Sequence, residues 1–149
     1  MSAFDTVKKL VQEWTPDPLA TELKYRDSLA AFIRDKAKGA KVETEYRHNG
    51  TTTDVYVKES GLFGSSEVFI ELKRNLQHKA QFDRLVGQIH ELQPKTNYIV
   101  VVFCGDTNPA LVTRFRELFP NSEDMTDFFV GFQPMVFVQK SHSKKAASK

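Results

Sequence analysis

Three charged residues, Asp54, Glu71 and Lys73, have the types and spacing that phosphodiester hydrolysis requires. Glu71 and Lys73 lie two positions apart in the run FIELKRNL (69–76), so in a β-strand their side chains point to one face. Asp54 comes 17 residues before Glu71, in the strand-like run TDVYVK (53–58). If the two runs pair through the turn-rich segment between them, both carboxylates lie near one end of a sheet.

This trio suggests metal-dependent chemistry. Two oxygen ligands a few ångströms apart suit Mg²⁺, which usually completes its shell with waters and substrate phosphate, and Mn²⁺ can substitute. A lysine on the same face could polarise or deprotonate a metal-bound water and stabilise charge on a phosphate. Asp54, Glu71 and Lys73 would then form a minimal phosphodiester-hydrolysing set.

The first half of the chain predicts two helices followed by three strands. Apolar residues from Phe4 to Trp14 recur at helical spacing, and TPDP (15–18) ends that helix. Asp17 followed by Pro18 predicts the start of a second helix, which runs to about Gly39. The runs 42–47, 53–58 and 67–73 predict an antiparallel meander, because the segments between them are rich in turn residues.

The second half alternates helices and strands. Helices are predicted over 81–93 and 109–119, and strands over 98–104 and 135–139. The unbroken apolar run YIVVVFC (98–104) is typical of a central strand covered on both faces. We therefore expect one α/β domain over residues 1–140, a central mixed sheet flanked by helices in the order α-β-β-β-α-β-α-β.

Two further polar residues fall on the apolar sides of predicted helices. Glu22 lies along the stripe that includes Leu29 and Ile33, and a carboxylate there needs a metal, an arginine or a lysine as partner. Gln88 lies about 60° from Leu85 around its helix, so its side chain could reach the edge of a site.

The order of these residues resembles the PD-(D/E)XK nuclease superfamily, which includes restriction endonucleases and Holliday-junction resolvases. The resemblance runs from Glu22 to Cys104 and rests on a helix glutamate, then D-x(16)-E-x-K on adjacent strands, then a helix with glutamine. It implies a restriction endonuclease-like core of α-β-β-β-α-β. Thr53 stands before Asp54 where the motif has proline.

The resemblance also implies roles. Asp54, Glu71 and the backbone carbonyl of Leu72 would bind Mg²⁺, and Lys73 would assist the attacking water. Glu22 would be an auxiliary carboxylate and metal ligand, and Gln88 would match the glutamine that some members carry.

Nearby cations could hold the DNA backbone, since such contacts need charge and reach rather than base-reading geometry. A nuclease of this size would plausibly act as a homodimer, with the Phe-rich stretch 127–137 as one source of an interface. The candidate DNA contacts are Lys24, Arg26, Arg74, Lys79 and Arg84.

Composition and net charge say little more about the function of the chain. The 149 residues carry a net charge of +2, and removing the lysine-containing tail 141–149, which we expect to be disordered, leaves −1. Bulk charge therefore gives no argument for nucleic-acid binding. One cysteine, no signal peptide and no membrane-length apolar stretch favour a cytoplasmic protein without membrane contact.

Each residue also has a plainer interpretation. Glu71 and Lys73 could form an exposed ion pair on an edge strand, Asp54 could close a turn, and Gln88 could lie at the surface. Glu22 could be a first-turn partner of the helix dipole, an idea that weakens if the helix starts at Pro18. For the whole chain, the alternatives are a non-catalytic module that binds nucleic acid or protein, and an interaction protein with no nucleic-acid role.

Overall fold

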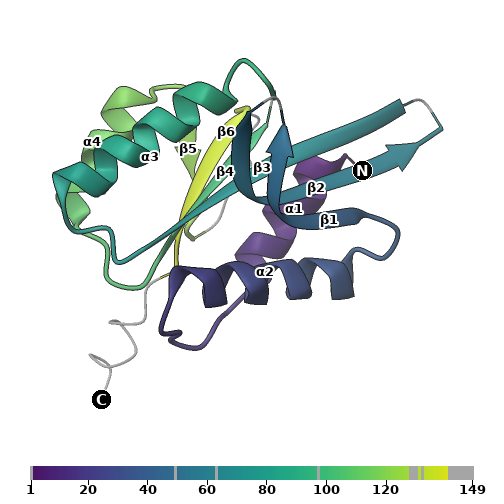
Figure 1. The fold of residues 1–149 in the computed structure, drawn as a ribbon, viewed down its shortest axis with the longest axis horizontal. Helices are drawn as coiled ribbons and strands as arrows, with labels where there is room; N and C mark the ends of the chain where they lie inside the picture. The colour runs from purple at the N-terminus through teal and green to yellow at the C-terminus, as the bar shows by residue number, and fades with distance from the viewer. Residues whose placement is uncertain are drawn as a thin grey trace.

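The computed structural model describes residues 2–48, 50–62, 64–96, 98–127, 131 and 133–140. The described chain forms a six-stranded mixed sheet in the order β1-β2-β3-β4-β6-β5, with helices on both faces (Figure 1). The helices are α1 (Ala3–Glu13), α2 (Glu22–Lys36), α3 (Lys79–Leu92) and α4 (Pro109–Leu118). The strands are β1 (Lys41–His48), β2 (Thr51–Gly61), β3 (Gly64–Arg74), β4 (Ile99–Cys104), β5 (Ser122–Asp124) and β6 (Met135–Lys140).

The sheet has an antiparallel half and a parallel half. The predicted meander is confirmed, because β1 pairs antiparallel with β2, and β2 pairs antiparallel with β3. From β3 onward the pairing with β4, β6 and β5 is parallel. All six residues of β4 are buried, as its unbroken apolar sequence predicts for a strand covered on both faces.

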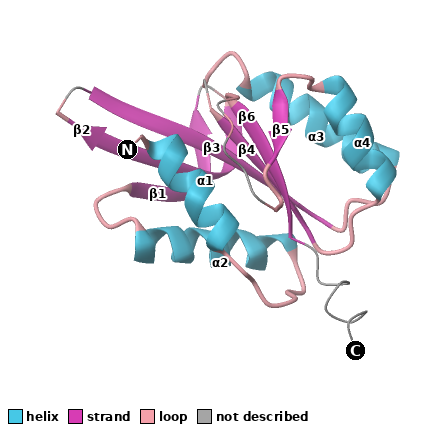
Figure 2. Cartoon of the chain, turned by 180° about the vertical axis from the view of Figure 1, so that it is seen from behind, coloured by secondary structure: helices cyan, strands magenta, loops and turns pink. Residues whose placement is uncertain are grey.

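Two apolar clusters lie on opposite faces of the sheet. Figure 2 shows α1 and α2 together on one side and α3 and α4 on the other. The α1/α2 side buries Val55, Ile70 and Val102, whereas the α3/α4 side buries Phe69, Val101 and Phe137. This alternation along β3 and β4 places Glu71, between Ile70 and Leu72, on the α3/α4 side.

The start of the second helix differs from the prediction. The sequence Asp17-Pro18 predicts a start at Pro18, but α2 begins at Glu22, and Thr21 is its N-cap, accepting from the amide of Lys24 at 3.1 Å. A hydroxyl that accepts from an N3 amide satisfies a donor that the helix leaves unpaired, and this cap prevails over the proline signal. The short strand β5 was also not predicted from the sequence.

The first helix is held by residues far along the chain. At its beginning, the amide of Ala3 donates to Ser66 Oγ at 2.8 Å. At its end, Lys140 Nζ donates to the carbonyls of Gln12 and Trp14, at 3.1 and 2.7 Å. A cation is favourable at the carbonyl end of a helix, so strand β6 secures α1 against the sheet.

Some predictions fall outside the described residues. These are the structure of the tail 141–149 and part of the Phe-rich stretch, namely residues 128–130 and 132. Within the described part of the chain, no helix is long and apolar enough to cross a membrane.

Packing of α4 gives a direct test of the architecture. Phe115 is fully buried against Phe103 and Phe137, whereas Leu118 on the same helix is 44% exposed. We expect Phe115→Ala to lower the free energy of unfolding by about 3–5 kcal/mol and Leu118→Ala by less than about 1 kcal/mol. Urea denaturation measures both, and equal losses would contradict this placement of α4.

Candidate active site

The site residues gather where the sheet divides. Pairing between β2 and β3 begins at Val55 and Ile70 and continues toward the hairpin tip. On the other side of that pair, β2 continues beside β1, and β3 continues beside β4. The two strands therefore separate, and backbone groups that face the gap between residues 51–54 and 71–74 need partners other than a neighbouring strand.

Two carboxylates supply those partners. Asp54 Oδ2 accepts a hydrogen bond from the amide of Leu72 at 2.8 Å, and Glu22 Oε2 accepts one from the amide of Arg74 at 3.0 Å. Thr53 lies beside Asp54, and its hydroxyl donates to the carbonyl of Ile70 at 3.1 Å. These side-chain bonds replace the strand pairing that ends at this point.

Asp54 and Glu71 face each other across the division. The register that pairs Val55 with Ile70 places Asp54 opposite Glu71 when it is extended by one residue. Opposed residues of antiparallel strands have their side chains on the same face. The strand register therefore brings Asp54 and Glu71 together, as the sequence predicts.

Glu71 is the least solvated acid of the site. Its side chain is 2% exposed, and Oε1 is buried without a hydrogen-bond partner among the described residues. Burial, and secondly the charge of Asp54, raise the pKa of Glu71 far above its ordinary value, while Lys73 has a smaller opposing effect. Glu71 therefore holds its proton at neutral pH unless a cation or a hydrogen-bond donor approaches.

Lys73 lies on the same edge of the site. Its Nζ is 4.0 Å from Glu22 Oε1, and the lysine side chain is 19% exposed. The strand β3 thus places Lys73 next to the buried carboxyl, and Lys73 is also the partner that the sequence predicts for Glu22 on α2. Because Glu22 satisfies both Lys73 and the amide of Arg74, it orients the strand end that carries Lys73.

The carbonyl of Leu72 points toward the same gap. The amides of Phe69 and Asn75 donate toward the β4 side, to Tyr98 and Cys104, so odd-numbered residues of β3 face β4. Leu72 faces the other way, as its bond to Asp54 shows. A residue in a strand directs its N–H and C=O to the same edge, so this carbonyl lies on the Asp54 side.

Gln88 is not a surface residue. Its side chain is partly buried, and its Oε1 has no hydrogen-bond partner within the described ranges. The helix α3 packs on the sheet face that carries Glu71, through neighbours such as Leu85 and Ile89. Two buried oxygens that lack partners, on Glu71 and Gln88, therefore belong to the same side of the sheet.

The structure rules out some of the plainer interpretations of these residues and supports another. The exposed ion pair on an edge strand is wrong, because β3 lies between β2 and β4 and Glu71 is buried. Asp54 lies within β2 and not in a turn. The helix-dipole role of Glu22 gains support, since α2 begins at Glu22 and this carboxylate therefore lies in the first turn.

The donor set fits a divalent cation. The buried, unpartnered oxygen of Glu71 beside Asp54 is an environment that a cation would stabilise, and the carbonyl of Leu72 faces the same gap. Glu22 is turned to Lys73 and Arg74 instead. In the part of the chain that the structure describes, no three His, Cys, Asp or Glu side chains are grouped as metal ligands.

The candidate DNA contacts are placed differently from one another. The side chain of Arg26 is only 11% exposed, and its guanidinium pairs with Asp27 at 2.9 Å and Glu45 at 2.6 Å. Lys79 pairs with Asp83 at 2.7 Å, and Arg74 Nε donates to the carbonyl of Leu19 at 3.1 Å. Lys24 and Arg84 are exposed. Arg26 is thus already paired with two carboxylates, whereas Lys79 lies at the surface.

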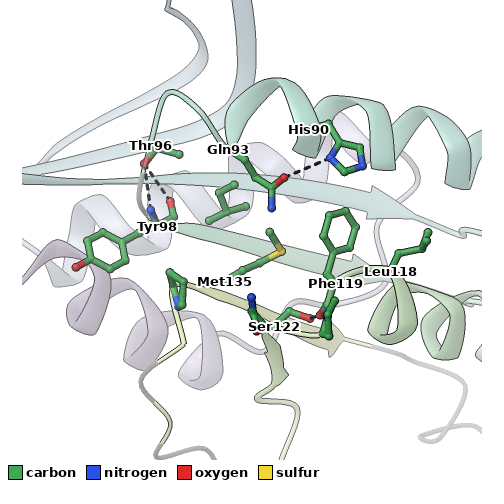
Figure 3. Close-up of a pocket in the computed structure, with 12 residues that line it drawn as sticks. His90, Gln93, Thr96, Tyr98, Leu118, Phe119, Ser122 and Met135 are labelled. Carbon is green, nitrogen blue, oxygen red and sulfur yellow. Dashed lines mark hydrogen bonds between the residues drawn. The ribbon is translucent and has the colours of Figure 1, made fainter.

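A separate hollow lies between the ends of α3 and α4, with a volume of about 730 Å³. Figure 3 shows Met135 and Phe119 among its apolar lining, with His90 and Gln93 at the helix end. None of its lining residues is acidic, and neither Asp54 nor Glu71 contributes to it. The hollow is therefore not the site of the proposed metal chemistry.

Comparison with known proteins gives no relative. No protein-family model, curated protein or solved structure matches the chain. The assignment of function therefore depends on the geometry of the site.

The raised pKa of Glu71 predicts a specific pH dependence. In the unfolded chain Glu71 has a pKa of about 4.3 and has lost its proton above pH 5. In the folded protein the raised pKa keeps that proton bound. Without divalent cations, stability should therefore fall as pH rises from about 5 to 9, and Glu71→Gln should reduce this decline.

Urea midpoints across that pH range measure the effect, with the exposed Glu117→Gln as control. Parallel pH profiles for the wild type and Glu71→Gln would contradict the buried, protonated carboxyl.

Proposed function

We propose that this protein is a metal-dependent endonuclease that hydrolyses DNA phosphodiester bonds by the chemistry of the PD-(D/E)XK superfamily. The observation that carries the proposal is the buried oxygen of Glu71, which has no partner in the described chain and faces Asp54 where the sheet divides. A carboxylate costs free energy in such a place unless a cation or donor meets it.

Within this proposal each residue has a defined part. Asp54, Glu71 and the carbonyl of Leu72 hold Mg²⁺, or Mn²⁺ in its place, and the bound ion supplies Lewis acidity and a more acidic water. Lys73 stabilises negative charge on the phosphate and assists proton removal from the attacking water. Glu22 keeps Lys73 in place through its 4.0 Å contact. Gln88 offers an acceptor at the edge of the site.

The proposed substrate follows from the charge distribution. The basic residues near the site are few and several are already paired, so the enzyme would bind DNA by backbone contacts from exposed cations such as Lys24, Lys79 and Arg84. Cutting both strands of a duplex or branched DNA would require two sites, which a homodimer provides.

The first experiment measures cleavage of supercoiled plasmid and of a four-way DNA junction with Mg²⁺ or Mn²⁺. We expect Asp54→Asn and Glu71→Gln to reduce cleavage to the level seen with EDTA, because each removes a carboxylate that would bind the cation. Lys73→Met should lower the rate by about 10²–10⁴-fold, the usual contribution of a general acid–base group.

Lys38→Met is the matched control, because Lys38 is 81% exposed in its side chain and lies beyond the far end of α2. Metal-dependent cleavage that survives in Glu71→Gln would overturn the proposal. Titration calorimetry with Mn²⁺ adds a readout without DNA, in which binding should strengthen with pH as Glu71 releases its proton.

Glu22 permits a second test, which separates a positioning role from metal ligation. In Glu22→Gln an amide oxygen can still accept from the amide of Arg74, but the charge beside Lys73 is lost. We expect Mn²⁺ affinity to change less than twofold while the rate of cleavage falls, since Lys73 loses the charged group that holds it in place.

A loss of Mn²⁺ binding comparable with that of Asp54→Asn would show instead that Glu22 is a metal ligand. Thr21→Ala, which weakens the cap of the same helix by about 1 kcal/mol, controls for general loosening of α2.

A non-catalytic binding module remains the second candidate, and one observation favours it. Asp54 and Glu22 already satisfy backbone amides of β3, so both could be retained for structure alone. This alternative predicts DNA binding that depends on salt without cleavage, and no Mn²⁺ binding at Asp54 and Glu71.

A further inference from the structure

A group of four rings lies beside the candidate active site, on strands β1, β2 and β3. Tyr46 stacks on Tyr56 with ring centroids 3.8 Å apart and planes 9° from parallel. The ring of His48 lies 6.4 Å from Tyr46 with its plane only 12° away. Phe69 meets Tyr46, His48 and Tyr56 nearly edge-on, at angles between 75° and 82°. Three nearly parallel rings thus stand on one perpendicular ring.

This arrangement depends on an unusual backbone at Glu45. Val42 packs on the α1/α2 side, so by alternation Tyr46 would share that face. Glu45 has a φ of 50°, a left-handed conformation that costs a residue other than glycine roughly 1 kcal/mol, and Tyr46 instead packs on the α3/α4 side. The 2.6 Å ion pair with Arg26 holds Glu45 in place. The chain therefore maintains a locally unfavourable conformation that brings Tyr46 and His48 to the face of Glu71.

The rings adjoin the site directly. Tyr46 pairs with Thr53, the neighbour of Asp54, and adjacent strands lie about 4.8 Å apart. Along the other two strands, Tyr56 is two residues from Asp54, and Phe69 is two residues from Glu71, on the same face. Tyr56 and Phe69 are buried, but Tyr46 and His48 on the edge strand are partly exposed.

The charges around the rings are mixed. Lys95 donates to the hydroxyl of Thr51, the residue that pairs with His48, and Tyr56 donates its own hydroxyl to Glu67 at 2.6 Å. Arg47 is exposed, but it alternates with Tyr46 and His48 along the strand and therefore points to the opposite face. The nearby Glu45 is neutralised by Arg26. Flat rings with Lys95 close by match the way proteins hold unpaired bases, with aromatic stacking for the base and positive charge for the backbone.

We propose that Tyr46 and His48 form a stacking platform for unpaired bases, so that the substrate is single-stranded DNA or the single-stranded part of a branched DNA. The platform presents one or two bases next to Asp54 and Glu71, and the adjoining phosphate reaches the acids. This inference rests on the proposed nuclease for the cleavage step, but base stacking requires only the platform itself.

The test is binding of a fluorescent oligodeoxythymidylate and of a blunt DNA duplex in EDTA, where no metal-dependent cleavage occurs. Tyr46→Ala and His48→Ala should each weaken binding of the single strand by about 5- to 100-fold, the range for loss of one stacked base. Duplex binding should change less than twofold. Tyr46→Phe keeps the stacking surface and should bind as the wild type does.

Leu62→Ala is the matched control, because Leu62 is 98% exposed at the tip of the β2–β3 hairpin, away from the platform. Single-strand binding that is unchanged in Tyr46→Ala, or lost equally for single strand and duplex, would overturn the platform. Thermal melting shows whether Tyr46→Ala is folded. If it is not, His48→Ala decides, and unchanged single-strand binding by that folded variant would overturn the platform.

The two proposals fail in different ways. Cleavage that requires Asp54 but does not change with Tyr46→Ala or with base pairing of the DNA would support the nuclease and contradict the platform. Binding of single strands that requires Tyr46, without cleavage of any DNA, would leave the platform and remove the nuclease.

Discussion

The division of the sheet after Val55 and Ile70 is the constraint on which the rest of the site depends. A strand that leaves its neighbour exposes amides that must find acceptors, and an unmet buried amide costs about 1–3 kcal/mol. Asp54 and Glu22 meet two of these donors, at Leu72 and Arg74. The backbone therefore requires acceptors here, and the two acids that serve as acceptors lie next to Glu71 and Lys73.

The same carboxylates satisfy backbone amides and lie where a cation could bind. Their structural and chemical roles are therefore hard to separate. A carboxylate with two oxygens can accept from an amide with one and face a cation with the other. Asp54 has that arrangement available, since the amide of Leu72 donates to Oδ2 and not to Oδ1. Glu71 is different, because no strand geometry calls for a buried carboxyl with an oxygen that lacks a partner in the described structure. A cation bound beside Asp54 would stabilise that oxygen.

Much of this was predictable from local sequence, and the exceptions share a cause. The alternation of apolar residues and the turn residues between the runs were enough to predict the three-strand meander. The spacing between Asp54 and Glu71 was enough to predict that they lie near each other. The start of α2 was misplaced because a hydroxyl cap at Thr21 competes with a proline signal. The turn of Tyr46 onto the α3/α4 side depends on a contact between Arg26 and Glu45, 19 residues apart. Such tertiary contacts override local periodicity and leave no trace in it.

The way α1 is anchored has a consequence for how the chain folds. Its ends are bonded to Ser66 and Lys140, and the latter contact joins residues 126 positions apart. During synthesis on a ribosome, the last turn of α1 could not be fixed until Lys140, 126 residues after Trp14, had been made. Contacts of such long range slow folding, because the loop between them must close first. The helix α1 thus precedes the sheet in the sequence but is fully secured only once β6 is present.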